Sequence, residues 1–193
     1  LDVLPLKKSM ELLREIIGDE RVCKESQIAE DICNWLGHLP LGLELIGRYL
    51  AEDIHLKLID VLNQLKTQSL NNIAIDLSEE QTQEKYIMTA QRGVKAAFEL
   101  TWNELSKKPL SRANLIKNLF TRKSSIATDL ACLLSLFSPD IIPWELVELV
   151  CKDLKWSHTD ISEARKNLYK RHVIQLIESN IYSIHPLVRE FLN

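Results

Sequence analysis

The sequence predicts a mainly α-helical protein, in which a short helical bundle is followed by a winged-helix domain with a two-stranded β-hairpin. Apolar residues recur at intervals of three and four over most of the chain, which is the period of helices with one buried face. Near the end the period changes to that of strands, in residues 173–177 and 181–184. The residues Glu178, Ser179 and Asn180 between these runs are typical of a hairpin turn. A capped helix before a hairpin completes the winged-helix pattern.

Four short helices are predicted in residues 1–66, which form the first domain. A stop at Gly18 ends the first helix, and Ser26 is a candidate N-cap for the second. The third helix follows a sharp corner, and the fourth precedes a polar stretch. The apolar stripes of the four helices contain Met10, Leu13, Ile16 and Ile17; Ala29, Ile32, Cys33 and Leu36; Leu41, Leu45, Ile46, Tyr49 and Leu50; and Leu58, Leu62 and Leu65.

The corner between the second and third helices, residues 37–45, is the stretch around which the chain is organised. Gly37 can take the left-handed conformation that ends a helix, because it has no Cβ. Pro40 can open the next helix, since the first helical position does not need a backbone N–H. From these residues alone, the corner is either a packing feature or part of a binding site.

A polar linker is predicted at residues 67–84, and the second domain at residues 85–193. Helices are expected around residues 94–105 and 126–137, after Pro143, and from Asp160 to about Arg171, where Asp160 and Glu163 form a capping box. The basic run at residues 121–125 is interpreted as a solvated loop, and the role of the whole stretch 107–125 is left open. The core of this domain is expected to contain Phe98, Trp102, Leu133, Leu136, Phe137, Leu146 and Leu168.

Composition and missing motifs exclude several functions. The 193 residues carry a net charge of −3, which gives no general attraction to nucleic acid or anionic membranes. No apolar run is long enough to span a membrane and no signal peptide is present, so we expect a cytoplasmic protein without a membrane partner. The four cysteines lack C-x-x-C spacing and are expected to be reduced. The chain starts without methionine and stops inside a helical pattern, so we expect a piece of a longer protein.

Catalytic chemistry is not indicated either. The sequence has no phosphate-binding glycine motif, no H-E-x-x-H and no G-x-S-x-G. Its five histidines lie on different predicted elements. We therefore expect no catalytic residue, no metal site and no enzymatic activity of this chain alone.

His185 is the one histidine in a suggestive position, between a predicted strand and a helix opened by Pro186. There its ring could donate a hydrogen bond to a phosphate beside helix N-terminal amides, which favour anions. The alternative is that the ring caps the helix. The helix at 161–171 could read DNA through Arg165 and Lys166, but the acidic wing turn favours a solvated face and no nucleic-acid partner.

Four motifs in order resemble the NB-ARC (STAND-class) nucleotide switches of bacterial type. Gly37, Pro40, Leu41 and Leu45 match the G-L-P-L motif of the family's helical domain. The segments 4–6 and 97–105 are similar to its exit from the nucleotide-binding domain and to the start of its winged helix. Residues 182–191 are similar to its histidine motif, although Ile184-His185-Pro186 stands where Met-His-Asp is common.

The resemblance implies that this chain is the regulatory part of an ADP/ATP-dependent signalling switch and lacks the P-loop domain. Pro40 would pack against adenine and His185 would contact the β-phosphate of ADP, with Gly37 and Leu41 as secondary residues. The full-length protein would bind ADP or ATP as a slow ATPase or switch, whereas this chain alone would bind neither tightly. Its partners would be an upstream P-loop domain, a downstream sensor or repeat domain, and further copies on activation. A winged-helix DNA-binding regulator and a helical interaction module are the alternatives.

Overall fold

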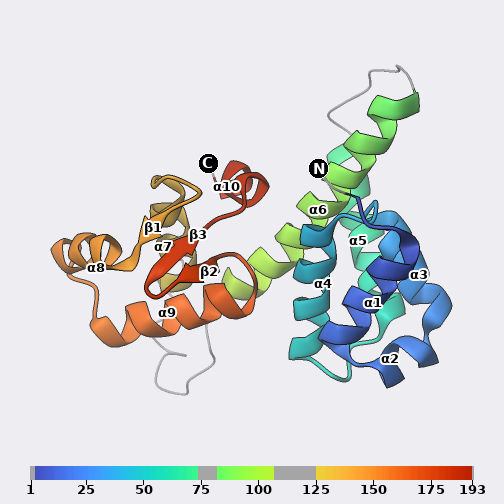
Figure 1. Cartoon of the computed structure of the whole chain (residues 1–193), viewed down its shortest axis with the longest axis horizontal. Helices are drawn as coiled ribbons and strands as arrows, with labels where there is room; N and C mark the ends of the chain where they lie inside the picture. Colours follow the sequence, from blue (N-terminus) through green and yellow to red (C-terminus); the bar gives the residue numbers. More distant parts are fainter. Residues whose placement is uncertain (1–2, 74–81, 107–124, 193) are drawn as a thin grey trace. The chain divides into compact units, whose positions relative to one another are not determined.

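Two compact units, residues 1–101 and residues 102–193, make up the protein. The computed structural model describes residues 3–73, 82–106 and 125–192, and in these ranges it contains ten helices and a three-stranded antiparallel sheet (Figure 1). The predicted mainly helical fold is confirmed, and the predicted two-stranded hairpin is part of a three-stranded sheet. We call the first unit the helical unit and the second the winged-helix unit, and we describe each by itself.

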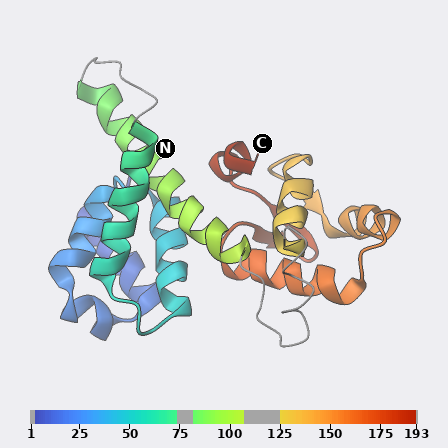
Figure 2. The same ribbon diagram turned by 180° about the vertical axis from the view of Figure 1, so that it is seen from behind.

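The helical unit is built from five helices and most of a sixth. Figure 2 shows the ribbon from behind. In chain order these are α1 (Leu6–Ile17), α2 (Asp19–Lys24), α3 (Ser26–Trp35), α4 (Pro40–Glu52), α5 (Leu58–Ile73) and α6 (Thr82–Ser106). The predicted apolar stripes face its core: Leu13, Ile32, Leu45 and Leu65 are all fully buried. The stop at Gly18 is also confirmed, because this residue follows α1 with φ of +91°.

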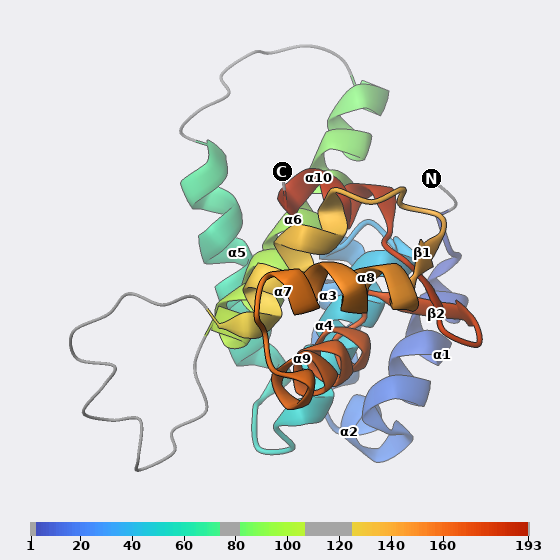
Figure 3. The same ribbon diagram turned by 90° about the vertical axis from the view of Figure 1, so that its left-hand side faces the viewer.

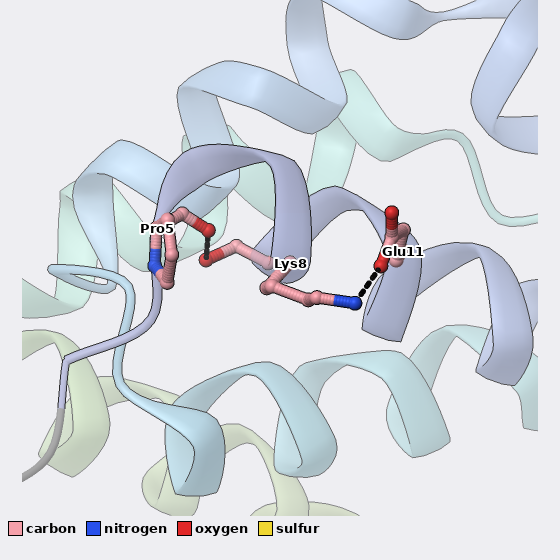
Figure 4. A network of polar contacts seen from close by, with 4 residues as sticks. Pro5, Lys8 and Glu11 are labelled. Carbon is pink, nitrogen blue, oxygen red and sulfur yellow. Dashed lines mark hydrogen bonds and ion pairs between the residues drawn. The ribbon is translucent and has the colours of Figure 1, made fainter.

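Helix α1 packs against α4 and α3. Its contact with α4 is close at Gly47, where an added Cβ would lie 2.9 Å from Ile16 Cδ1. At the first turn of α1, the hydroxyl of Ser9 donates to Pro5 O over 3.3 Å, and Lys8 pairs with Glu11 at 2.7 Å (Figure 4). The ion pair is solvent-exposed and contributes little to stability, whereas Ser9 is fully buried.

Helix α2 was not predicted, because six residues give too short a pattern to recognise. It places Arg21 against the end of α4, where Nη1 donates to Leu50 O over 2.7 Å and Nη2 donates to Asp53 O over 3.2 Å and to Leu56 O. The Arg21 side chain thus ties the α4–α5 loop to α2. Partial burial lowers the pKa of its guanidinium.

The region between the two predicted domains is more helical than expected. Residues 67–73, predicted to begin the linker, are the last turns of α5, and α6 begins at Thr82. The buried residues Val94 and Phe98 of α6 fall in the helical unit, which ends at Thr101. The division by contacts therefore lies at Thr101, whereas the sequence placed the start of the second domain at residue 85.

The winged-helix unit contains α7 (Ile126–Ser135), β1 (Ile142–Pro143), α8 (Trp144–Asp153), α9 (His158–Lys170), β2 (Gln175–Glu178), β3 (Ile181–Ser183) and α10 (Pro186–Leu192). Its sheet has the order β1-β3-β2, with Tyr182 opposite Ile142 on one side and Leu176 on the other. This order of helices and strands is the winged-helix topology. The hairpin turns through Asn180, at φ of +67°, and the strand β1 was missed because it has only two residues.

Three helix ends differ from the prediction. Ser26, the candidate N-cap, is instead the first residue of α3. The side chain of Ser157, not Asp160, caps α9 by accepting a hydrogen bond from Asp160 N over 3.2 Å. Asp160 therefore lies inside the first turn. Helix α7 ends at Ser135, so Leu136 lies at its C-cap with 74% of its surface exposed.

The core of the winged-helix unit accordingly uses other residues than some of those predicted. Leu168 is fully buried as expected, but Leu136 and Leu146 are exposed. The inward residues of α7 and α8 are instead Ala127, Leu130, Ala131 and Leu134, and Trp144, Val147 and Cys151. The Trp144 ring packs edge-on against Tyr182 at 5.3 Å and lies under the Arg165 guanidinium at 4.8 Å. The helix-to-strand change in period therefore located this domain, but not all of its inward faces.

Candidate functional site

The corner after α3 is a Schellman turn. Gly37 has φ of +61°, and its N–H bonds to Asn34 O over 3.0 Å. His38 follows with φ of +57°, and its N–H bonds to Cys33 O, also over 3.0 Å. These two bonds satisfy carbonyl groups that the end of α3 leaves without helical partners. The left-handed conformation predicted for Gly37 is confirmed.

Pro40 is the first residue of α4, as predicted. Leu39 is extended, with φ of −78° and ψ of 124°, and its side chain is 3% exposed. Leu41 is 7% exposed, so its side chain belongs to the core of the helical unit. Pro40 itself is half-buried. Of the four residues named from the sequence, Gly37, Pro40 and Leu41 lie together in this turn.

The turn is held by the start of the chain. Leu4 N donates to His38 O over 3.0 Å, and the hydroxyl of Ser9 lies 3.1 Å from His38 Nδ1. Ser9 is fully buried in α1 and also bonds to Pro5 O. Leu4, in the segment that precedes α1, thus holds the backbone of His38, and Ser9 of α1 holds its ring.

Helix α6 supports the same turn from another side. A Cβ at Gly93 would lie 2.8 Å from Trp35 O and 3.2 Å from Leu36 Cα. Both atoms belong to the backbone at the end of α3, so only glycine allows this approach. The sequence did carry a signal for Gly93, because a glycine inside a helix costs about 1 kcal/mol relative to alanine and often marks close packing.

His185 lies between β3 and α10 in the winged-helix unit. The preceding Ile184 is 2% exposed, and its N–H bonds to Pro139 O over 2.8 Å. The following α10 is anchored by the buried Val188 and by Arg189, whose Nε donates to Ser135 O over 2.8 Å. His185 itself is half-buried. Neither Arg189 nor Ser135 was singled out from the sequence, although together they hold the helix that follows His185.

The His185 ring caps α10. Its Nδ1 accepts a hydrogen bond from Leu187 N over 3.2 Å, and Pro186 has no N–H. The expected helix N-terminal amides are therefore not all available to an anion, because the ring engages one and the proline lacks another. The cap has a chemical consequence, since a neutral ring that accepts at Nδ1 carries its hydrogen at Nε2.

The described residues bear on both metal binding and cysteine reactivity. Among them, no three His, Cys, Asp or Glu side chains lie close enough to hold a metal ion. Cys33 is buried, and burial, with a smaller effect of Glu30, raises the pKa of its thiol to about 12. Burial also raises the thiol pKa of Cys132 and Cys151. These three thiols are therefore weakly ionised at neutral pH.

The DNA-binding alternative gains little from α9. Arg165 lies over the Trp144 ring, so it contributes to packing within the unit. The wing between β2 and β3 exposes Glu178, Ser179 and Asn180, of which only Glu178 is charged. A wing that contacts phosphate would instead present basic residues. Elsewhere in the described ranges, the helices lack the combination of length and apolar character that crossing a membrane requires.

No family model matches the chain. The chain is similar to the regulatory protein AfsR of Streptomyces coelicolor, with 28% identity over 105 residues. This match covers 54% of the chain but only 9% of the relative's length. A regulatory role is therefore consistent with the comparison, which extends over about half of the chain.

Proposed function

We propose that this chain is the helical and winged-helix part of an ADP/ATP-dependent signalling switch, and that it closes over ADP held by a P-loop domain elsewhere in the same protein. The observation that carries the proposal is the Schellman turn, which presents the half-buried Pro40 at the start of α4. The order of a helical unit before a winged helix and the similarity to a regulatory protein support it.

The residues present fit part of an ADP site. The Pro40 ring offers an apolar surface on which adenine can pack. In the proposal His185 contacts a phosphate oxygen through Nε2, the atom that carries the ring hydrogen when Nδ1 accepts from Leu187 N. The sequence contains no phosphate-binding glycine motif, so the phosphate cradle has to come from another domain. This chain alone should accordingly not bind ADP tightly.

In this proposal the phosphates of ADP carry the negative charge that His185 binds, and the winged-helix unit docks on the bound nucleotide. A hydrogen bond from His185 to a phosphate exists only when the winged-helix unit is docked. Such a bond to a charged group contributes about 1.5–3 kcal/mol, and its loss would shift the balance toward the open state by about 10- to 150-fold. The open state would then exchange nucleotide and form oligomers.

Two substitutions of His185 test the phosphate contact through Nε2 and the helix cap through Nδ1 separately. Both are made in the full-length protein, which in this proposal carries the P-loop domain. His185→Asn places Oδ1 where Nδ1 lies, so it keeps the acceptor for Leu187 N but loses the donor at Nε2. His185→Gln can reach the Nε2 position but not the cap. We expect ADP release to accelerate about 10- to 150-fold in His185→Asn and much less in His185→Gln. Release at the wild-type rate from His185→Asn would refute the role in phosphate binding and leave the structural cap.

The DNA-binding regulator is distinguished by a separate measurement. The proposed switch predicts that this chain is not retained on DNA at physiological salt. Salt-dependent retention on duplex DNA, lost on substitution of Lys166, would favour the alternative instead. A helical interaction module without nucleotide dependence would show neither DNA retention nor a change of ADP release in the His185 variants.

A further inference from the structure

Helix α8 has two apolar faces. Trp144, Val147 and Cys151 face the core of the winged-helix unit and are at most 1% exposed. On another face lies a second stripe, made of Leu146, Leu149 and Val150 in the helix and Leu154 at its C-cap, which are 49%, 60%, 37% and 50% exposed. The spacing of three, four and eight residues places these four side chains side by side along the helix. We call them the α8 stripe; Figure 3 views the molecule from the side on which α8 lies.

Single exposed apolar residues are common, but a continuous exposed stripe marks an interaction surface. The α8 stripe is not explained by the fold, because the inward face of the same helix already fills the core. The occupant must therefore be identified from what surrounds the stripe.

The charges beside the stripe point to an occupant. Glu145 and Lys152 are both exposed and lie seven residues apart, so they occupy the same flank of the stripe beside Leu149. At 1.5 Å per residue, about 10 Å separates them along the helix. Acidic residues at the start and basic residues at the end of a helix also favour its dipole. The dipole accounts for the two charges, but not for the leucines between them.

We propose that the α8 stripe binds the α8 stripe of a second copy of this chain, with the two helices antiparallel about a two-fold axis near Leu149. In that arrangement Glu145 of each copy faces Lys152 of the other, so two ion pairs flank the apolar contact. In a parallel arrangement about a two-fold axis, the flank that carries Glu145 and Lys152 would lie on opposite sides of the contact in the two copies, so these residues would form no ion pairs between copies. Of these two orientations, only the antiparallel one brings Glu145 of one copy to Lys152 of the other. This contact involves neither Pro40 nor His185.

The contact is expected to be weak. Helix α8 has ten residues, and four side chains form the stripe. Such a surface is smaller than the roughly 1,200 Å² of total area buried in stable complexes, so it belongs with transient interfaces. We therefore expect this chain to be a monomer when dilute and to dimerise reversibly as its concentration rises.

Sedimentation equilibrium of residues 1–193 and of charge-reversed variants tests the proposal. Glu145→Lys and Lys152→Glu should each be monomeric at concentrations where the wild type dimerises, because each places like charges opposite each other twice. An equimolar mixture of the two variants should dimerise again, since the lysines of one chain then face the glutamates of the other. Leu149→Glu should abolish association by burying a charge. Ile54→Glu, at a residue that is 75% exposed in the helical unit, is the control and should leave association unchanged.

Circular dichroism melts of each variant show whether it is folded before its mass is interpreted. A folded wild type that stays monomeric at about 1 mM would overturn the proposal and leave the stripe to another protein. A dimer that survives Leu149→Glu would also overturn it, because association would then use another surface. So would a mixture of the two charge variants that remains monomeric while the wild type dimerises, since this result contradicts the antiparallel order.

Discussion

Replacing Gly93 by alanine should destabilise the helical unit, although alanine is the better helix former. Inside a helix the substitution gains about 1 kcal/mol from backbone entropy. The added Cβ would lie 2.8 Å from Trp35 O and 3.2 Å from Leu36 Cα, and neither atom can move without moving the end of α3. Overpacking costs about 1–3 kcal/mol and sometimes more, and contact with backbone belongs at the upper end. We expect a net loss of about 1–2 kcal/mol.

Urea unfolding of Gly93→Ala, followed by tryptophan fluorescence, measures this loss. Gly42→Ala is the matched control on α4, because its Cβ would meet only side chains, Leu36 Cδ2 and Val94 Cγ2, each at 3.3 Å. These side chains can shift, so Gly42→Ala should stay within about 1 kcal/mol of the wild type. A Gly93→Ala variant as stable as the wild type, or more stable, would show that α6 does not hold the Schellman turn in this way.

Because Leu136 is exposed and Leu168 is buried, we expect Leu136→Ala to change the free energy of unfolding by less than about 0.5 kcal/mol and Leu168→Ala to lower it by about 2–5 kcal/mol; chemical denaturation compares the two. Ser157→Ala should lower stability by about 0.5–2 kcal/mol through loss of the cap on α9, and Asp160→Ala should cost less in the same melts. The Cys33 thiol, with an ordinary pKa near 9 and a folded pKa of about 12, predicts a pH dependence. Above pH 9 the unfolded chain loses this proton and the folded chain keeps it, so stability should fall by up to about 1.4 kcal/mol per pH unit. Cys33→Ala should remove this part of the slope in melts between pH 9 and 11, and an unchanged slope would assign it to other groups.

The parts of the fold that could be predicted from the sequence are those with local signals. Gly37 and Pro40 define the corner because the conformational needs of a C′ residue and of a first helical residue are met by few amino acids. The change of period at Val173 located the hairpin for a similar reason. Strand β1 has no such signal, since two residues acquire their strand character only by pairing with β3.

Errors arose where two neighbouring residues could play one role. Ser157 and Asp160 are both good N-caps one turn apart, and only the packing of α9 decides between them. Leu136 continues the apolar run of α7, but the helix ends before it without a glycine to mark the end.

The site was predictable in part. The turn residues follow from local chemistry, whereas Gly93 acts on residues 35 and 36, which lie far from it in the sequence. His185 was weighed as either cap or phosphate donor, and its bond to Leu187 N establishes the cap. The donor role stays a prediction, which the Asn and Gln variants address.

The bond between Leu4 N and His38 O gives the corner a mechanical role. This bond joins the segment that precedes α1 to the turn that follows α3. His38 could not yield alone, because its own N–H is bound to Cys33 and its ring to Ser9. A displacement of the segment around Leu4 should therefore also displace the turn that precedes Pro40.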